Sequence, residues 1–281
     1  MNAFTHTLTL DQLQNLPNAI IFDCRHDLAQ PTLGAAQYAE NHIQGAFFAG
    51  LDTHLSGVKT GHNGRHPLPQ REAFTAWLAQ CGVNLNTQIV CYDALDGMFA
   101  ARLWWLCRWV GLQNVAVLAG GFAGWQAAGG AVSNAAPLPI AQPAWQAPAL
   151  EKVMLAEELL AHLHSPKHLL LDARAPERYR GEVEPMDPVA GHIPSAANHF
   201  FKRNVTAQGN FAPDLTAQWQ QVLGAHASTQ VIHTCGSGAT ACHNILALHV
   251  AGLLAPHQAS TLYAGSWSEW CSDAARPVAR G

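Results

Sequence analysis

The sequence predicts an α/β protein of two related domains, each a mainly parallel sheet with helices on both faces. The chain has 281 residues, a length that suggests two domains at roughly 150 residues each. Short apolar runs alternate with helical patterns in both halves. Several short motifs also occur twice, in the same order, about 140 residues apart, which is too long for a solenoid repeat and suits a duplicated domain.

Three pairs of motifs carry this internal repeat. Each half has an apolar run that ends in Asp-x-Arg, then a His-Ile pair, then a segment from glycine to tryptophan. The pairs are Asp23-Cys24-Arg25 with Asp172-Ala173-Arg174, His42-Ile43 with His192-Ile193, and Gly121–Trp125 with Gly265–Trp270. Their shared order indicates that the two halves have the same fold.

The expected domains are residues 1–134 and 149–281, joined by residues 135–148. The joining segment has four prolines and no charged residue, which is typical of an extended surface linker. The strands expected in the second half are 168–171, 230–234 and 261–263, and the helices are 156–163, 215–223 and 240–250.

Composition narrows the class of protein. Hydrophobic residues make up 49% of the chain and charged residues 12%, so sizeable cores are expected. The net charge is −4 with no Lys/Arg run, which makes nucleic acid and anionic membranes poor partners. The N-terminus lacks the pattern of a secretory signal, and the most apolar stretch, Ala101 to Leu112, is interrupted by Arg102 and Arg108. Seven cysteines without framework spacing then predict free thiols in a reducing cytoplasm.

One cysteine has the surroundings of a nucleophile. Cys235 follows a predicted buried strand and opens the loop Cys235–Thr240, which contains Gly236 and Gly238 and leads into a helix. Loop amides and the helix N-terminus stabilise a thiolate at such a place. The glycines allow the backbone to fold tightly around an anion. The pattern predicts a reactive thiol that can carry a persulfide on the same amides.

Two other chemistries fit this loop poorly. Cysteine phosphatases need an arginine where this chain has Ala241, and the loop contains no cation to clamp a phosphate dianion. Cys242 and His243 are adjacent on a helix and point about 100° apart, so they are not expected to share a metal ion. No metal and no cofactor is expected.

The loop Cys235–Ala241 resembles the active loop of 3-mercaptopyruvate sulfurtransferases in the tandem rhodanese family, although Ala239 stands where the family usually has valine. The resemblance extends over essentially the whole chain, through the duplicated motifs. It implies two rhodanese-like domains and a persulfide on Cys235. In the first domain Asp93 replaces the nucleophile, so that domain is expected to be catalytically degenerate. Cys91, two residues earlier, is expected to be a structural strand residue.

The resemblance also implies roles around the loop. Arg178 would bind the anionic end of the substrate, and His66 would act with Ser237 in proton transfer to the leaving enolate. The alternative for His66 is a structural histidine; Asp52 is a loosely aligned candidate to orient it. Met186 stands where these enzymes often have a second arginine, and Arg180 is the candidate to replace it. The remaining substrate-binding positions are the loop residues Gly236, Gly238, Ala239, Thr240 and Ala241.

The neutral loop favours a 3-mercaptopyruvate donor, because related loops that bind the thiosulfate dianion carry cations. The expected function is sulfur transfer from 3-mercaptopyruvate, through the Cys235 persulfide, to cyanide or to a thiol such as thioredoxin or glutathione. The alternatives are a thiosulfate sulfurtransferase and a non-catalytic rhodanese-like binding module.

Overall fold

The computed structural model describes residues 3–281, and their contacts divide into two compact units. The first unit contains the chain up to Gly57, Pro69–Leu150 and Val205–Phe211. The second contains Val58–Leu68, Glu151–Asn204 and Ala212–Gly281. Each unit therefore takes in a short segment from the opposite half of the chain. The expected domain limits at residues 134 and 149 stay predictions.

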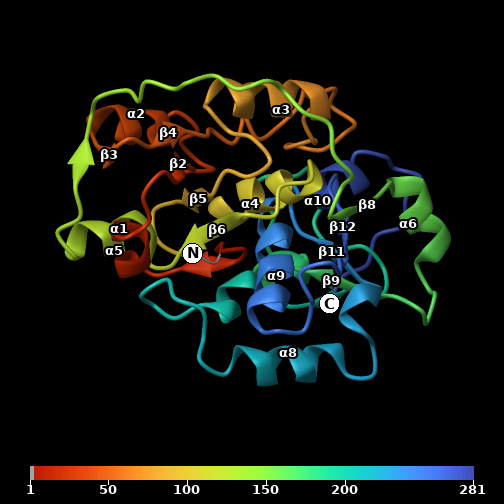
Figure 1. The fold of residues 1–281 in the computed structure, drawn as a ribbon. Coiled ribbons are helices and arrows are strands. Elements are labelled where there is room, and N and C mark those ends of the chain that lie inside the picture. Colours follow the sequence, from red (N-terminus) through yellow and green to blue (C-terminus); the bar gives the residue numbers. More distant parts are fainter. Residues whose placement is uncertain (1–2) are drawn as a thin grey trace. The chain divides into compact units, whose positions relative to one another are not determined.

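The first unit is built on a parallel five-stranded sheet in the order β1-β6-β5-β2-β4 (Figure 1). Its strands are β1 (Thr7–Leu8), β2 (Ile20–Asp23), β4 (Phe47–Phe48), β5 (Ile89–Tyr92) and β6 (Val115–Leu118). A separate antiparallel pair is formed by β3 (His42–Ile43) and β7 (Val132–Ser133).

Helices cover both faces of this sheet. They are α1 (Leu10–Gln14), α2 (Leu33–Glu40), α3 (Arg71–Gln80), α4 (Ala100–Trp109) and α5 (Gly121–Ala127). On one face Phe22 of β2 contacts Trp77 of α3, with ring centroids 5.4 Å apart. On the other face Tyr92 of β5 stacks on Phe122 of α5 at 5.9 Å. Helix α4 packs on β5 and β6 and is buried from Ala100 to Arg108, which accounts for its apolar sequence.

The second unit repeats this topology with the parallel order β10-β9-β11-β12-β8. Its strands are β8 (Lys152–Met154), β9 (Leu169–Asp172), β10 (Ala197–Asn198), β11 (Val231–Thr234) and β12 (Thr261–Tyr263). Its helices are α6 (Ala156–His162), α7 (Pro176–Tyr179), η1 (Phe201–Asn204), α8 (Leu215–Leu223), η2 (Ser228–Gln230), α9 (Ala239–Val250) and α10 (Ser266–Trp270). The strands and helices expected for this half are confirmed to within one residue at each end.

The duplicated Asp-x-Arg motif makes the same contacts in both units. The Nε of Arg25 donates to both carboxylate oxygens of Asp23, at 3.1 and 2.9 Å. Arg174 repeats this on Asp172, at 3.1 and 3.0 Å. Each arginine also donates to a backbone carbonyl just before the His-Ile pair, Asn41 or Gly191. The motif thus ties the end of a central strand to the segment that follows, which is a structural role.

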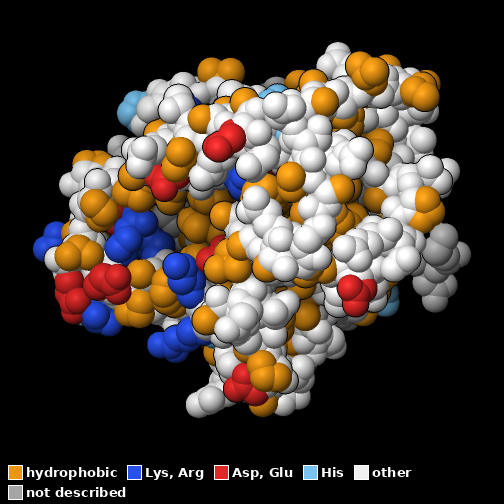
Figure 2. Space-filling view, turned by 90° about the vertical axis from the view of Figure 1, so that its left-hand side faces the viewer, with side chains coloured by type: hydrophobic (Ala, Val, Ile, Leu, Met, Phe, Trp, Pro, Cys, Tyr) orange, Lys and Arg blue, Asp and Glu red, His pale blue; other side chains and the backbone are white. Residues whose placement is uncertain are grey.

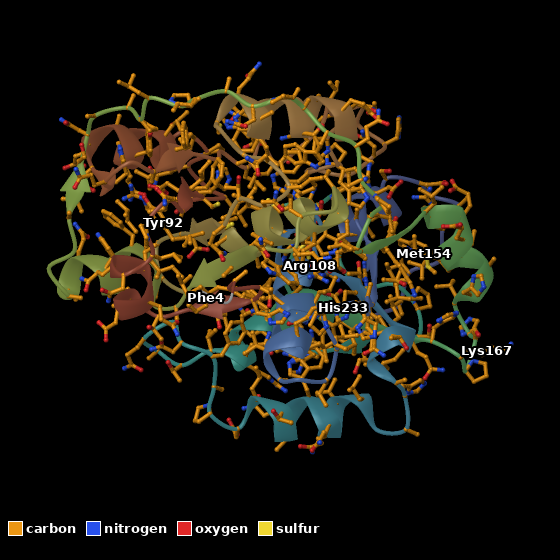
Figure 3. The ribbon with its side chains drawn as sticks, viewed as in Figure 1. Phe4, Tyr92, Arg108, Met154, Lys167 and His233 are labelled. Atoms are coloured by element: carbon orange, nitrogen blue, oxygen red, sulfur yellow. The ribbon has the colours of Figure 1, made fainter. Side chains whose placement is uncertain are left out.

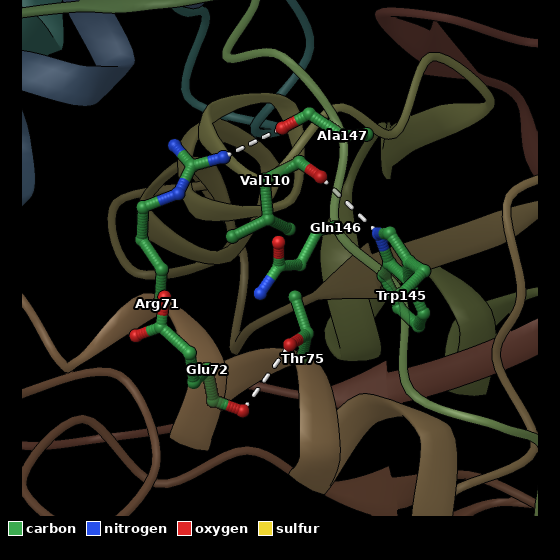
Figure 4. Close-up of a pocket in the computed structure, with 7 residues that line it drawn as sticks. All are labelled: Arg71, Glu72, Thr75, Val110, Trp145, Gln146 and Ala147. Atoms are coloured by element: carbon green, nitrogen blue, oxygen red, sulfur yellow. Dashed lines mark hydrogen bonds between the residues drawn. The ribbon is translucent and has the colours of Figure 1, made fainter.

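Residues 135–148 contain no helix or strand and lie along α3 in the first unit. The Trp145 indole donates to the carbonyl of Val110 at 3.2 Å, and Arg71 donates to that of Ala147 at 2.9 Å (Figure 4). The residues in that figure line a small pocket between this segment and α3. Its lining contains neither a cysteine nor a histidine, and we assign it to packing of the segment.

Apolar side chains fill the interior of each unit, and most charged side chains lie at the surface. Tyr92 and His233 come from central strands and are surrounded by side chains, whereas the exposed Lys167 lies at the periphery (Figure 3). On the face drawn in Figure 2, Lys and Arg side chains gather beside Asp and Glu, and much of the remaining surface is uncharged. Within residues 3–281, no helix is both long and apolar enough to span a membrane.

Candidate active site

Cys235 lies directly after β11, at the start of the loop that leads into α9. Its side chain is buried, with 2% of its surface exposed. Gly238 caps α9 with φ at 85°, a left-handed conformation that favours glycine. In this conformation its N–H donates to Sγ of Cys235 at 3.0 Å. The sulfur therefore sits beside the N-terminus of a 12-residue helix, where the free amides and the dipole favour negative charge.

The start of α10 holds the loop from the other side. The N–H of Cys235 donates to the Ser266 hydroxyl at 3.1 Å, and that hydroxyl lies 4.0 Å from Sγ. The N–H groups of Trp267 and Ser268 donate to the carbonyls of Cys235 and Gly236, at 2.9 and 3.0 Å. Ser266 belongs to the duplicated motif Gly265–Trp270, but no sequence pattern singles it out as a partner of Cys235. These bonds fix the loop backbone against the start of α10.

His66 and Ser237 form a hydrogen-bonded pair in the second unit. Nδ1 of His66 lies 2.7 Å from Oγ of Ser237, and the two residues are 5% and 6% exposed. The structure thus brings His66, from the segment Val58–Leu68, against Ser237 of the loop that bears Cys235. Asp52 belongs to the first unit, where its carboxylate lies 4.0 Å from Nε2 of His26.

Arg178 lies beside the loop, whereas Arg180 does not. A Cβ placed on Gly236 would lie 3.4 Å from Nη1 of Arg178. Arg178 also donates to Glu184 at 2.7 Å and to Asp187 at 3.4 Å. Arg180 instead forms an exposed ion pair with Glu182 at 2.7 Å. Arg180 therefore pairs with Glu182 at the surface and not with the loop, and its replacement of the second arginine stays a prediction.

Arg65 is the cation that sequence reasoning missed. A Cβ on Gly236 would lie 2.9 Å from Nη2 of Arg65, closer than to Arg178. Arg65 forms an ion pair with Asp187, and its backbone N–H donates to the Ser268 hydroxyl at 3.0 Å. Its position immediately before His66 was the available signal. The loop is neutral, as expected, but two guanidinium groups lie against it.

Arg174 is a third arginine near Arg65 and Arg178, and it pairs with Asp172 and Glu184. Burial acts to lower the pKa of Arg174, but Asp172, Glu184 and Cys235 together outweigh burial and raise the pKa above its usual value. Arg174 therefore remains charged, and it contributes positive potential at Cys235.

The remaining predicted loop residues, Ala239, Thr240 and Ala241, form the buried first turn of α9. Next to them, the thiol of Cys242 donates to the carbonyl of Gly238 at 3.1 Å. His243 is hydrogen-bonded through Nδ1 to Asn204 at 3.2 Å. Residues 3–281 contain no group of three His, Cys, Asp or Glu side chains placed to bind a metal.

All seven cysteines are free and buried, but their surroundings differ. Burial raises the pKa of Cys81 and of Cys271 to about 11. The pKa values of Cys24 and Cys91 are raised well above the usual value, again chiefly by burial. These thiols stay protonated at neutral pH. Cys91 lies within β5, as expected of a structural residue.

The matching loop of the first unit contains a carboxylate. Asp93 follows β5 as Cys235 follows β11, and it is 3% exposed. Its two oxygens accept from the backbone N–H groups of Leu95, Gly97, Phe99 and Ala100, at 3.1, 3.0, 2.8 and 3.2 Å. In the second unit the N–H of Gly238 donates to a sulfur, whereas here four amides donate to a fixed carboxylate and no thiol stands at this place.

This carboxylate predicts a pH dependence of stability. Burial raises the pKa of Asp93 to about 6, although its backbone hydrogen bonds oppose the shift. The folded protein thus binds this proton more tightly than the unfolded chain, so the group's stabilising contribution is present below pH ~4 and lost as pH rises through about 6. The expected loss is on the order of 1–3 kcal/mol.

Urea unfolding at several pH values between 4.5 and 7.5 tests this expectation. Asp93→Asn also removes hydrogen bonds, so it should lower stability throughout. Its unfolding free energy should nevertheless change less with pH than that of the wild type. Parallel pH profiles of the two proteins would contradict the assignment.

A known protein family matches the two halves of the chain separately. The rhodanese-like domain family matches residues 7–128 and 155–273. A Pseudomonas aeruginosa protein named "Probable 3-mercaptopyruvate sulfurtransferase" is 44% identical over 269 residues, covering 94% of this chain and 93% of the relative. The thiosulfate sulfurtransferase of Cricetulus griseus is 33% identical over 242 residues, covering 83% of this chain and 78% of its own.

A solved structure agrees with the sequence relatives. The 3-mercaptopyruvate sulfurtransferase of Leishmania major superposes with a TM-score of 0.81 and 29% identity, over 95% of this chain and 74% of its own. The expected fold is confirmed by the two parallel sheets and by both family matches. The chain therefore belongs to the rhodanese family, as a member with two rhodanese-like domains in tandem.

Proposed function

We propose that the chain is a sulfurtransferase that takes sulfur from 3-mercaptopyruvate and carries it as a persulfide on Cys235. The observation that carries the proposal is the 3.0 Å bond from the Gly238 N–H to Sγ of Cys235, at the N-terminus of α9. That bond favours an anionic sulfur both before and after the transfer. The names of the similar proteins support the same reaction class.

In the first step the Cys235 thiolate attacks the sulfur of the donor. A sulfur–sulfur bond forms, the donor's carbon–sulfur bond breaks, and its electron pair leaves with carbon as the enolate of pyruvate. Protonation of that carbon completes pyruvate. The Ser237 hydroxyl, 2.7 Å from His66, is the group we assign to deliver this proton, with His66 re-protonating the serine.

In the second step a nucleophile attacks the outer sulfur of the persulfide. Cyanide would leave as thiocyanate, and a thiol would take the sulfur as its own persulfide, regenerating the Cys235 thiolate. Thioredoxin or glutathione is the proposed class of thiol acceptor. We assign no transfer to the first domain, because Asp93 occupies the place of the nucleophile and uses its amides.

A thiosulfate donor is the second candidate. Two arginines, Arg65 and Arg178, lie beside Gly236, and a dianion needs such cations. The name of the Cricetulus griseus relative points to the same donor. Only the leaving group differs between the two reactions, because sulfite would depart in place of the enolate.

The intact-protein mass after exposure to donor tests the proposal. Incubation with 3-mercaptopyruvate, without an acceptor, should add one sulfur, about 32 Da, which cyanide then removes. Peptide mapping should place the added sulfur on Cys235. An unchanged mass with both donors would overturn the enzymatic assignment and favour a binding module.

Arg178 should contribute to donor binding. Arg178→Ala removes a charge-assisted contact worth about 1.5–3 kcal/mol, so kcat/KM for 3-mercaptopyruvate should fall roughly tenfold to over a hundredfold. Arg180→Ala is the matched control, because Arg180 lies in an exposed ion pair two residues away. Equal kcat/KM values for wild type and Arg178→Ala would remove Arg178 from the site.

A further inference from the structure

We propose that Asp187 and Arg65 set the charge of the donor that the site accepts, so that a monoanionic α-keto acid is preferred over a dianion. Arg65 and Arg178 together receive the donor's carboxylate, and Asp187 neutralises part of their charge. This inference rests on the proposed function, and it names two residues for which the sequence analysis had no role.

The geometry places both arginines at the reactive loop. Their Nη atoms would lie 2.9 and 3.4 Å from a Cβ on Gly236, the residue next to the nucleophile. Both side chains are largely buried, at 24% and 18% exposed for Arg65 and Arg178. Each also has a buried Nε–H without a hydrogen-bond partner among residues 3–281. Buried donors of this kind are satisfied by an incoming anion.

Asp187 is positioned to hold the two cations together. It is 3% exposed at its side chain and pairs with Arg65 through one oxygen. Its other oxygen lies 3.4 Å from Arg178. The chain therefore lacks the second arginine expected at Met186 but has an arginine from a distant segment, held by the residue next to Met186.

The charges of the cluster balance before a donor binds. Its cations are Arg65, Arg174 and Arg178, and its anions are Asp172, Glu184 and Asp187. The Cys235 thiolate adds one negative charge. No donor charge then faces an excess of positive charge, so each further negative charge on the donor adds to the cost of binding in a site of low effective dielectric. A single carboxylate has a smaller desolvation cost and can use the unpartnered N–H groups.

Removing the charge of Asp187 should therefore admit thiosulfate. We expect Asp187→Asn to raise the ratio of kcat/KM for thiosulfate to kcat/KM for 3-mercaptopyruvate by roughly tenfold or more, the size of one charged contact. Asp187→Glu, which keeps the charge, should retain a ratio near that of the wild type. Arg180→Gln, at the exposed ion pair with Glu182, is the control for loss of a nearby charge and should leave the ratio unchanged.

The variant Arg65→Gln tests the proposed charge selection independently of Asp187→Asn. It removes one of the two cations and leaves Asp187 with Arg178 alone, so both donors should lose activity, with a greater loss for thiosulfate than for 3-mercaptopyruvate. The loss with 3-mercaptopyruvate should appear mainly in KM, because Arg65 contacts the carboxylate and not the transferred sulfur. If the melting profile of Asp187→Asn shows that this variant does not fold, Arg65→Gln still tests whether the charge of the cluster sets the donor preference.

An arginine introduced at Gly236 would be a poorer probe, because its Cβ would displace the guanidinium of Arg65. A folded Asp187→Asn protein with the wild-type donor ratio would overturn the inference, as would an equal loss for both donors in Arg65→Gln. Absence of transfer by the wild type from either donor would instead overturn the proposed function, so the two failures are distinguishable.

Discussion

Replacing Cys235 by serine is expected to abolish sulfur transfer from both donors, lowering turnover by a factor of about 10³ or more. A serine hydroxyl cannot form a persulfide, and its much higher pKa leaves it protonated beside the Gly238 N–H. Turnover with cyanide as acceptor gives the rate, and intact-protein mass should show no added sulfur.

Cys242→Ser and Cys91→Ser are the matched controls. Cys242 is buried seven positions further on in α9, and Cys91 lies in the strand that precedes Asp93. Both variants should keep the catalytic rate of the wild type, apart from any loss of folded protein. Wild-type turnover in Cys235→Ser, with loss in either control, would show that the nucleophile is elsewhere.

Replacing His66 by glutamine is expected to lower kcat with 3-mercaptopyruvate by about 10²-fold or more, the usual contribution of a positioned proton donor. The enolate must gain a proton on carbon, and the Ser237 hydroxyl, 2.7 Å from His66, is the group placed to supply it. Sulfite leaves thiosulfate without protonation. The same variant should therefore affect transfer from thiosulfate far less.

Two further variants separate catalysis from structure. Ser237→Ala should reproduce the loss of His66→Gln, and the double variant should lose little more, because the two residues act through one hydrogen bond. His62→Gln, in an exposed position of the same segment, should keep full activity with both donors. An equal fall with both donors in His66→Gln would assign His66 to structure.

The local sequence was sufficient to predict those features whose residues are close both in the chain and in space. A strand, Cys235, two glycines and a helix form one continuous segment, so the sequence predicts both the loop and its preference for an anion. The duplicated Asp-x-Arg motifs predict the repeated sheet for the same reason, since each pair bonds across two residues. The role of Arg178 was implied by the resemblance alone; the structure places Arg178 beside Gly236, and the role stays a prediction.

The sequence alone predicts the fold class, the repeat and the strand, loop and helix around Cys235, whereas the charges that face this loop depend on tertiary contacts. Arg178 and Arg180 stand two residues apart at the end of α7, where side chains two positions apart point about 200° apart, so Arg178 meets the loop and Arg180 meets solvent. Arg65 and Asp187 are 122 positions apart and meet because Val58–Leu68 packs with the second unit. Charge pairs between distant segments depend on how the chain folds back, which no local pattern encodes.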